Sequence, residues 1–191
     1  MKKFKIKNVK RVSQLLDAYF NPKEPITFLH IGKSAGTWLK QGIAGHYLPT
    51  RVYKEFDYAA FDGKTKEIAK KYDFVAAHIG SRLCNEIGNP TVTVLRDPYE
   101  RMLSLYYYLR EVEHERSTHR LAKELNFSDF LKCEDWRVNC DTHNLQTYQI
   151  AYGFMPEERA YLDDNFSQIE VLELAKHNIE KMAAVGIVED M

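Results

Sequence analysis

Short apolar runs alternate along this chain with stretches in which apolar residues recur at helical spacing. Four runs have the length and composition of buried strands: ITFLHI (26–31), FVAAHI (74–79), TVTVLR (91–96) and AAVGIV (183–188). Helices are expected near Thr37–Tyr47, from Pro98 onward, and as one or two elements within Pro156–Lys181. Residues 50–72 are polar and mixed and predict a connection with a short element or two, whereas residues 115–126 predict a charged helix or loop.

Strands that alternate with helices in this way form βαβ units, whose strands run parallel in one sheet. The chain has 191 residues, of which 45% are hydrophobic and 28% are charged, and this is enough for one well-filled core. We therefore expect a single α/β domain over residues 1–191, with a central parallel β-sheet flanked by helices. Ligands of such sheets bind at the carboxyl ends of the strands, so the loops that follow the strands are candidate sites.

The loop after the first run, in FLHIGKSAGTWLK (28–40), carries the first candidate chemistry. Gly32 ends the apolar run and Thr37 opens the helical pattern, so the segment between them turns from strand into helix. The first turn of a helix leaves backbone N–H groups unpaired, and the helix dipole favours negative charge there. The segment from Lys33 to Thr37 is therefore predicted to bind an anion, with phosphate as the expected group. The alternative is an ordinary exposed loop lysine.

The stretch VLRDPYERMLSLYYYLR (94–110) contains the start of a long helix. Asp97 is a suitable N-cap residue and Pro98 suits the first helical position. Glu100 is expected to complete a capping box by accepting a hydrogen bond from the Asp97 N–H. These three residues predict a helix that begins at Pro98.

Arg96 is the last residue of the strand expected before this helix. Helical spacing places Asp97, Arg101 and Ser104 on one face, so Arg96 and Ser104 are predicted to hold one anion at the edge of the sheet, with Arg101 near enough to assist. The alternative is that Arg96 pairs with a neighbouring carboxylate and that Ser104 hydrogen-bonds to its own helix.

Composition and charge limit the classes of partner that the protein is expected to bind. The formal net charge is zero with a pI near 7.1, so no global basic balance argues for nucleic acid. Residues 1–11 hold six Lys or Arg and no acid, within a basic N-terminal segment (1–25), whereas residues 154–191 hold nine acids against three bases. No apolar stretch is long enough to span a bilayer, and the N-terminus lacks the apolar core of a signal peptide, which predicts a cytoplasmic protein. The three cysteines are expected to stay reduced.

Together, HIGKSAGTWL (30–39) and VLRDPYERMLSLYYYLR resemble the two cofactor motifs of sulfotransferases that use 3'-phosphoadenosine 5'-phosphosulfate (PAPS). The similarity is greatest to the branch that sulfates carbohydrate hydroxyls, such as uronyl 2-O-sulfotransferases, and it continues through FVAAHIG (74–80) and AKHNIEKMAAVGIVED (175–190). The resemblance implies a P-loop-like fold in which the first motif holds the 5'-phosphosulfate and the second holds the 3'-phosphate. It implies these cofactor-binding residues: Lys33, Ser34, Ala35, Gly36, Thr37, Trp38, Arg96 and Ser104.

The resemblance also places His78 where that branch carries its catalytic base. An imidazole titrates near the working pH and can take a proton from an acceptor hydroxyl, although a histidine among apolar residues is more often a core residue. Lys33 is expected to neutralise the charge that builds on the leaving phosphate oxygen, so that no metal is needed. His30 is expected to be a core residue or a neighbour of the loop.

The sequence thus predicts a single sulfotransferase-like domain, an enzyme that moves a sulfuryl group from PAPS to a hydroxyl of a carbohydrate or small metabolite. Two alternatives stay open: a nucleotide-dependent kinase with an atypical P-loop, although GxxxxGK[ST] is absent, and a catalytically silent nucleotide-binding module on the same fold. Asn144, Gln146 and Thr147 resemble family positions that face cofactor or acceptor, although an amphipathic helix start predicts the same polarity. The C-terminus is short relative to the family.

Overall fold

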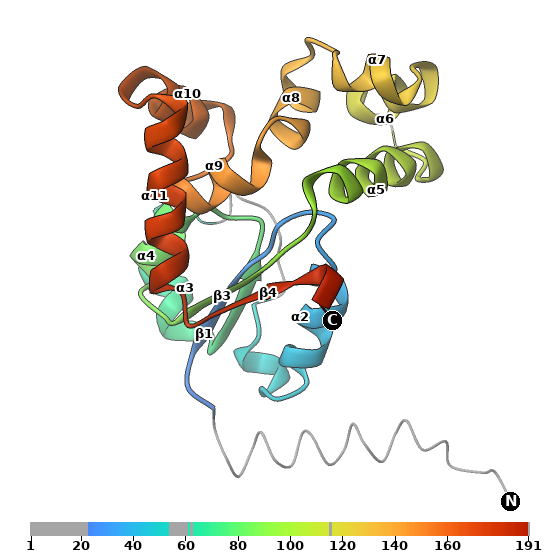
Figure 1. The fold of residues 1–191 in the computed structure, drawn as a ribbon. Helices are drawn as coiled ribbons and strands as arrows, with labels where there is room; N and C mark the ends of the chain where they lie inside the picture. Colours follow the sequence, from blue (N-terminus) through green and yellow to red (C-terminus); the bar gives the residue numbers. More distant parts are fainter. Residues whose placement is uncertain (1–22, 54–60, 62, 115, 191) are drawn as a thin grey trace, which may run out of the picture.

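Four parallel strands form the centre of the protein, in the order β2-β1-β3-β4 (Figure 1). The structure is a computed structural model that describes residues 23–53, 61, 63–114 and 116–190. The strands are β1 (Ile26–Leu29), β2 (Phe74–Ala77), β3 (Thr91–Leu95) and β4 (Ala184–Ile187). The predicted parallel sheet is confirmed, and each strand is one or two residues shorter than its apolar run. The basic segment 1–25 lies almost entirely outside the described residues.

Helices cover the sheet and extend beyond its carboxyl edge (Figure 1). They are α2 (Gly36–Ala44), α3 (Thr65–Lys71), α4 (Ser81–Ile87), α5 (Pro98–Glu111), α6 (Ser117–Glu124), α7 (Phe127–Leu131), α8 (Trp136–Thr142), α9 (Leu145–Ala151), α10 (Pro156–Asn165) and α11 (Gln168–Lys181), with 3-10 turns η1 (Pro49–Arg51) and η3 (Val188–Asp190). The helix expected to reach Tyr47 stops at Ala44, where Gly45 follows. In the described part of the chain, no helix is long and apolar enough to cross a membrane.

The side chains of the strands alternate between two packed faces, as a pleated sheet requires. Leu29, Val75 and Ala77 point to one face and pack with residues of α3, α4, α9 and α11. Phe28 and Phe74 point to the other face and pack with residues of α2 and β3. A third apolar cluster is separate from the sheet and holds α5, α6, α7 and α8 together. Its buried residues are Leu105, Tyr106, Leu109, Ala122, Phe130 and Val138.

The order of the strands places two loops side by side. From β1 the chain crosses to β2 on one side, and it later returns to β3 on the other side of β1. Leu29 pairs with Thr93, and the Thr93 hydroxyl donates a hydrogen bond to the Leu29 carbonyl oxygen at 2.8 Å. In parallel α/β sheets, the crevice at such a reversal of strand order is the usual binding position. The loops that follow β1 and β3 therefore meet at this crevice.

The start of α5 differs in one detail from the sequence-based expectation. Asp97 is the N-cap and accepts a hydrogen bond from the Glu100 N–H at 3.0 Å, as predicted. The reciprocal half of the capping box is wrong, because the Asp97 N–H donates to the Glu189 carboxylate at 3.1 Å. Strand β4 lies beside β3, and it brings Glu189 of η3 over this turn. Glu100 instead lies 3.7 Å from the Arg96 guanidinium.

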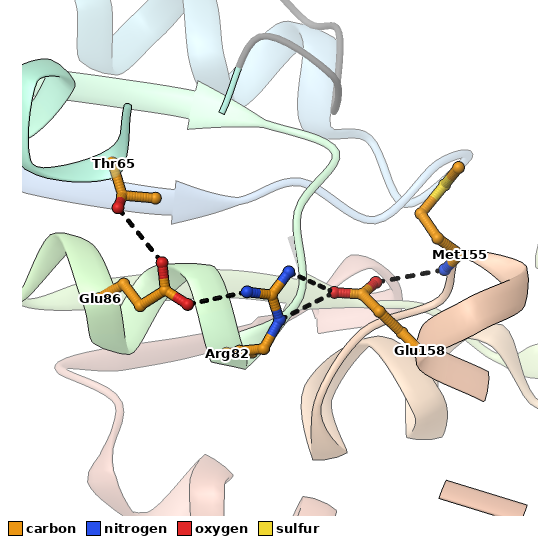
Figure 2. Close-up of polar contacts among 5 residues, drawn as sticks. All are labelled: Thr65, Arg82, Glu86, Met155 and Glu158. Carbon is orange, nitrogen blue, oxygen red and sulfur yellow. Dashed lines mark hydrogen bonds and ion pairs between the residues drawn. The ribbon is translucent and has the colours of Figure 1, made fainter. Parts of the chain in front are cut away.

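An ion pair ties the segment after β2 to the start of α10 (Figure 2). Arg82 of α4 contacts the Glu158 carboxylate at 3.1 Å, and Glu158 also accepts from the Met155 N–H at 3.3 Å. Glu158 is buried and packs against Gly153, where a Cβ atom would overlap the carboxylate. The loop between α9 and α10 is thereby fixed, and its Phe154 lines the cavity described below.

Candidate active site

A cavity of about 880 Å³ opens at the carboxyl edge of the sheet, where the loops after β1 and β3 meet. It brings together nearly all of the predicted site residues: Lys33, Ala35, Gly36, Thr37, Trp38, His78, Arg96 and Ser104. Ser34 is the exception, because its side chain is 1% exposed and does not line the cavity. The sequence motifs therefore converge on one site, whereas the Ser34 hydroxyl is buried and is not part of its lining.

The loop after β1 has the strand-to-helix geometry that its sequence predicts. Lys33 and Ala35 adopt left-handed backbone conformations, with φ of 67° and 53°, and non-glycine residues rarely do so. Residues of this conformation within a turn direct backbone N–H groups toward a common centre and form concavities that bind anions. Helix α2 begins immediately afterwards at Gly36, so its first turn adds the favourable end of a helix dipole.

Lys33 extends from this loop toward α5. Its Nζ atom lies 4.0 Å from the centre of the Tyr108 ring, within the range of a cation–π contact. Burial lowers the pKa of Lys33, the neighbouring Arg96 lowers it further, and Glu111 opposes both effects. The ammonium is thus held over the cavity by an aromatic face.

Arg96 follows β3 and contacts the first loop directly. Its Nη1 atom donates to the Lys33 carbonyl oxygen at 3.2 Å, although the two residues are 63 positions apart. Glu100 and Glu189 lie 3.7 and 4.0 Å from the guanidinium. Arg96 therefore does pair with neighbouring carboxylates, as the alternative interpretation expected, but only at long distances. The buried Nε atom has no hydrogen-bond partner among the residues that the structure describes. Arg96 therefore lines the cavity with one N–H donor unsatisfied.

Two glutamines of α9 hold the strand ends in place. Gln146 accepts from the Arg96 N–H at 3.0 Å and donates to the Arg96 carbonyl oxygen at 2.8 Å. Gln149, which the sequence interpretation missed, is 1% exposed and donates to the carbonyl oxygens of His30 and Ile79 at 3.1 and 2.9 Å. Glutamines three residues apart share one helical face, and that spacing was the available signal.

Asn144 and Thr147 lie elsewhere. Both line a smaller hollow between α9 and α11, away from the cavity at the carboxyl edge. Of the three polar positions singled out in this segment, Gln146 alone contacts a residue of the candidate site, through the Arg96 backbone.

His78 lies directly after β2, and its ring stacks on that of His30, which follows β1. The ring centres are 4.3 Å apart and the planes differ by 25°. Burial lowers the pKa of His78, a hydrogen bond to the His30 backbone opposes this, and Lys40 lowers the pKa further. The lowered pKa favours a neutral imidazole at pH 7, which is the form that accepts a proton.

The wall of the cavity that α5, α6 and the residues near them form carries guanidinium and imidazole groups. Arg101 is 2% exposed and donates through Nη2 to the Asp141 carbonyl oxygen at 2.5 Å, while its Nη1 has no hydrogen-bond partner within the described ranges. Burial raises the pKa of the Asp141 carboxyl, and Arg101 opposes that rise. The His114 and His119 rings stack at 5.0 Å on the same wall. Arg101 therefore lines the cavity together with Ser104, as the helical spacing predicts.

The fold and the cavity define an α/β protein with a four-stranded parallel sheet and an anion-suited site at its carboxyl edge. No model of a protein family matches the chain, and no curated protein matches it either. An assignment of activity therefore depends on the residues of the cavity themselves.

Proposed function

We propose that this protein is a sulfotransferase that moves a sulfuryl group from PAPS to a hydroxyl of a carbohydrate or small metabolite. The observation that carries the proposal is the contact between Lys33 and Arg96, which places two cations at the ends of neighbouring strands in one cavity. A sulfuryl donor that carries phosphate groups at two separate positions, as PAPS does, suits this arrangement. His78 in the same cavity supplies a neutral imidazole.

The residues of the cavity fit such a donor. In the proposal, the segment from Lys33 to Trp38 acts as a P-loop-like turn and binds the 5'-phosphosulfate through its N–H groups and the Lys33 ammonium. Arg96 and Ser104 bind the 3'-phosphate, and the Arg96 Nε atom has no hydrogen-bond partner among the described residues. Charge-assisted hydrogen bonds of this kind are stronger than bonds between neutral groups, so the phosphate displaces the distant carboxylates of Glu100 and Glu189.

The chemical step is an in-line transfer that resembles phosphoryl transfer. The acceptor oxygen forms a bond to sulfur while the bond between sulfur and the bridging phosphate oxygen breaks. The proton of the acceptor hydroxyl passes to the His78 imidazole. The electron pair of the broken bond stays on the 5'-phosphate oxygen, where the Lys33 ammonium offsets the developing charge.

The wall of the cavity that α5, α6 and the residues near them form carries further cationic groups. Arg101, Arg116 and His119 lie on this wall, and the Arg101 Nη1 atom has no hydrogen-bond partner in the described part of the chain. An acceptor that carries an acidic group beside its hydroxyl suits these cationic and imidazole groups best.

Ligand-induced stabilisation tests the donor site. Adenosine 3',5'-bisphosphate at about 100 times its dissociation constant should raise the melting temperature by roughly 5–10 °C without Mg²⁺. ATP at the same concentration should do much less, because it offers no 3'-phosphate to Arg96 and Ser104. Equal shifts would favour the kinase with an atypical P-loop instead. Transfer of labelled sulfate from PAPS to a panel of hydroxyl acceptors then tests turnover, and binding without turnover would indicate the catalytically silent module.

A further inference from the structure

A stack of three rings runs from the core of the sheet to the wall of the cavity. Phe28 and His30 are stacked with ring centres 5.5 Å apart and planes 18° apart. His30 and His78 continue the stack at 4.3 Å and 25°. Phe28 and His30 are buried, whereas His78 is partly exposed and lines the cavity. The middle ring therefore connects the rigid core to the candidate base.

The His30 ring is fixed from several sides. The start of α2 lies on it so closely that a Cβ atom at Gly36 would overlap the ring. The His30 N–H donates to the Ala77 carbonyl oxygen at 3.0 Å, and the His30 carbonyl oxygen accepts from Gln149 at 3.1 Å. Backbone and ring are thus both held, which leaves the His30 ring little freedom to rotate.

We propose that His30 is a positioning residue for His78, a fixed ring on which the His78 imidazole stacks while it takes the proton of the acceptor. The inference rests on the proposed function, because it assigns His30 a part in the proton transfer given to His78. The stacked His30 ring covers one face of the His78 imidazole and so contributes to the burial that lowers the pKa of His78. The fixed ring also keeps the His78 nitrogen in one direction, and small misplacements of catalytic groups are costly.

The burial of His30 and the charges near it prevent it from taking the proton in place of His78. Burial, followed by His78 itself and by Lys40 of α2, lowers the pKa of His30 to about 3. His30 therefore stays neutral at every pH at which His78 works, and it does not compete for the proton. Because the His30 ring faces the His78 imidazole directly, its loss should change the titration of His78, whereas loss of the exposed His177 ring should not.

Side-chain NMR of the full chain with labelled histidine tests the proposal without relying on turnover. In the wild type, the His30 ring should not titrate between pH 8 and pH 5, and a His30 pKa near 6.5 would overturn the proposal. In His30→Ala, water reaches the base, so the pKa of His78 should rise toward its ordinary value. In His30→Phe, which keeps a ring in the stack, the pKa of His78 should stay lowered. An unchanged His78 titration in His30→Ala would contradict the positioning role.

Kinetics supply the second readout. His30→Ala should lower kcat by about 10-fold to 100-fold with little change in KM for PAPS, the range expected for a misplaced catalytic group. His30→Phe should restore most of kcat, and His177→Ala, at an exposed position of α11, is the matched control. An equal loss of kcat in His30→Phe and His30→Ala would refute the stacking argument. If the wild type transfers no sulfate while His30→Ala still shifts the His78 titration, the proposed function fails and the coupling of the two rings stands.

Discussion

Lowering the pH from 7.5 to 5 should cost the folded protein about 2 kcal/mol through His30 alone. Burial, then His78 and Lys40, lowers the pKa of this imidazole to about 3 in the folded state. In the unfolded chain the pKa is about 6.5, so the unfolded state binds a proton that the folded state excludes. The stability is fully present above pH 6.5 and is lost as the pH falls toward the pKa of the folded state.

The size of the effect follows from the difference between these two pKa values. Each pH unit below about 6.5 costs roughly 1.4 kcal/mol, so pH 5 costs about 2 kcal/mol, and pH 3, where half of the folded molecules also bind the proton, costs about 4 kcal/mol. His30 is 6% exposed, so solvent screens the effect only slightly. His78 has a lowered pKa as well and acts in the same direction, which means that a variant must separate the two histidines.

Urea unfolding at pH 7.5 and at pH 5.0 measures the effect in the wild type, in His30→Phe and in the control His177→Ala. The wild type and the control should each lose about 2 kcal/mol more than His30→Phe between these pH values. The comparison uses the change with pH in each protein, so a different starting stability of His30→Phe does not matter. If His30→Phe loses as much stability as the wild type, the His30 ring is not held neutral by its surroundings and the reasoning fails.

Two further predictions address the site, and a third addresses the N-cap of helix α11. His78→Ala should leave binding of adenosine 3',5'-bisphosphate nearly intact and lower turnover by ~10²-fold or more, as measured by calorimetry and sulfate transfer, and lost binding would make His78 structural. Arg96→Ala should weaken adenosine 3',5'-bisphosphate by about 1.5–3 kcal/mol and barely change the affinity for adenosine 5'-phosphate; equal weakening of both ligands would assign Arg96 to the fold. Ser167→Ala removes the N-cap contact with the Glu170 N–H and should cost about 1 kcal/mol in urea unfolding, with no change in bisphosphate affinity.

The sheet could be predicted because parallel strands buried on both faces leave unbroken apolar runs in the sequence. The longer helices were found in the same way, since α5 and α11 each have 14 residues, long enough to show a periodic pattern. Helices α4, α7 and α8 have five to seven residues and were missed. A helix of two turns or fewer shows too few repeats of its period to be recognised, and its stability comes from tertiary packing.

The candidate site could be predicted only in part, because its two loops are visible in the sequence and their contacts are not. The sequence places Lys33 and Arg96 after apolar runs, but the adjacency of those runs depends on strand order. The stack of His30 on His78 depends on register, since Leu29 pairs with Ala77 and the two histidines are the next residues along each strand. The sequence pattern of a strand determines which side of the sheet each residue faces. The pairing register between strands depends instead on packing across the whole core.

Arg96 raises the question of whether the ion pairs around it explain its position without a ligand. Its contacts with Glu100 and Glu189, at 3.7 and 4.0 Å, are longer than hydrogen bonds, and both acids are exposed. Exposed pairs of this kind contribute little to stability, typically below about 1 kcal/mol. The stronger constraints act on the backbone, where Gln146 holds both the N–H and the carbonyl oxygen of Arg96. Arg96 has a fixed backbone and weak carboxylate contacts, and its Nε atom has no hydrogen-bond partner within the residues that the structure describes. Such a side chain is better suited to bind a mobile anion than to hold the fold.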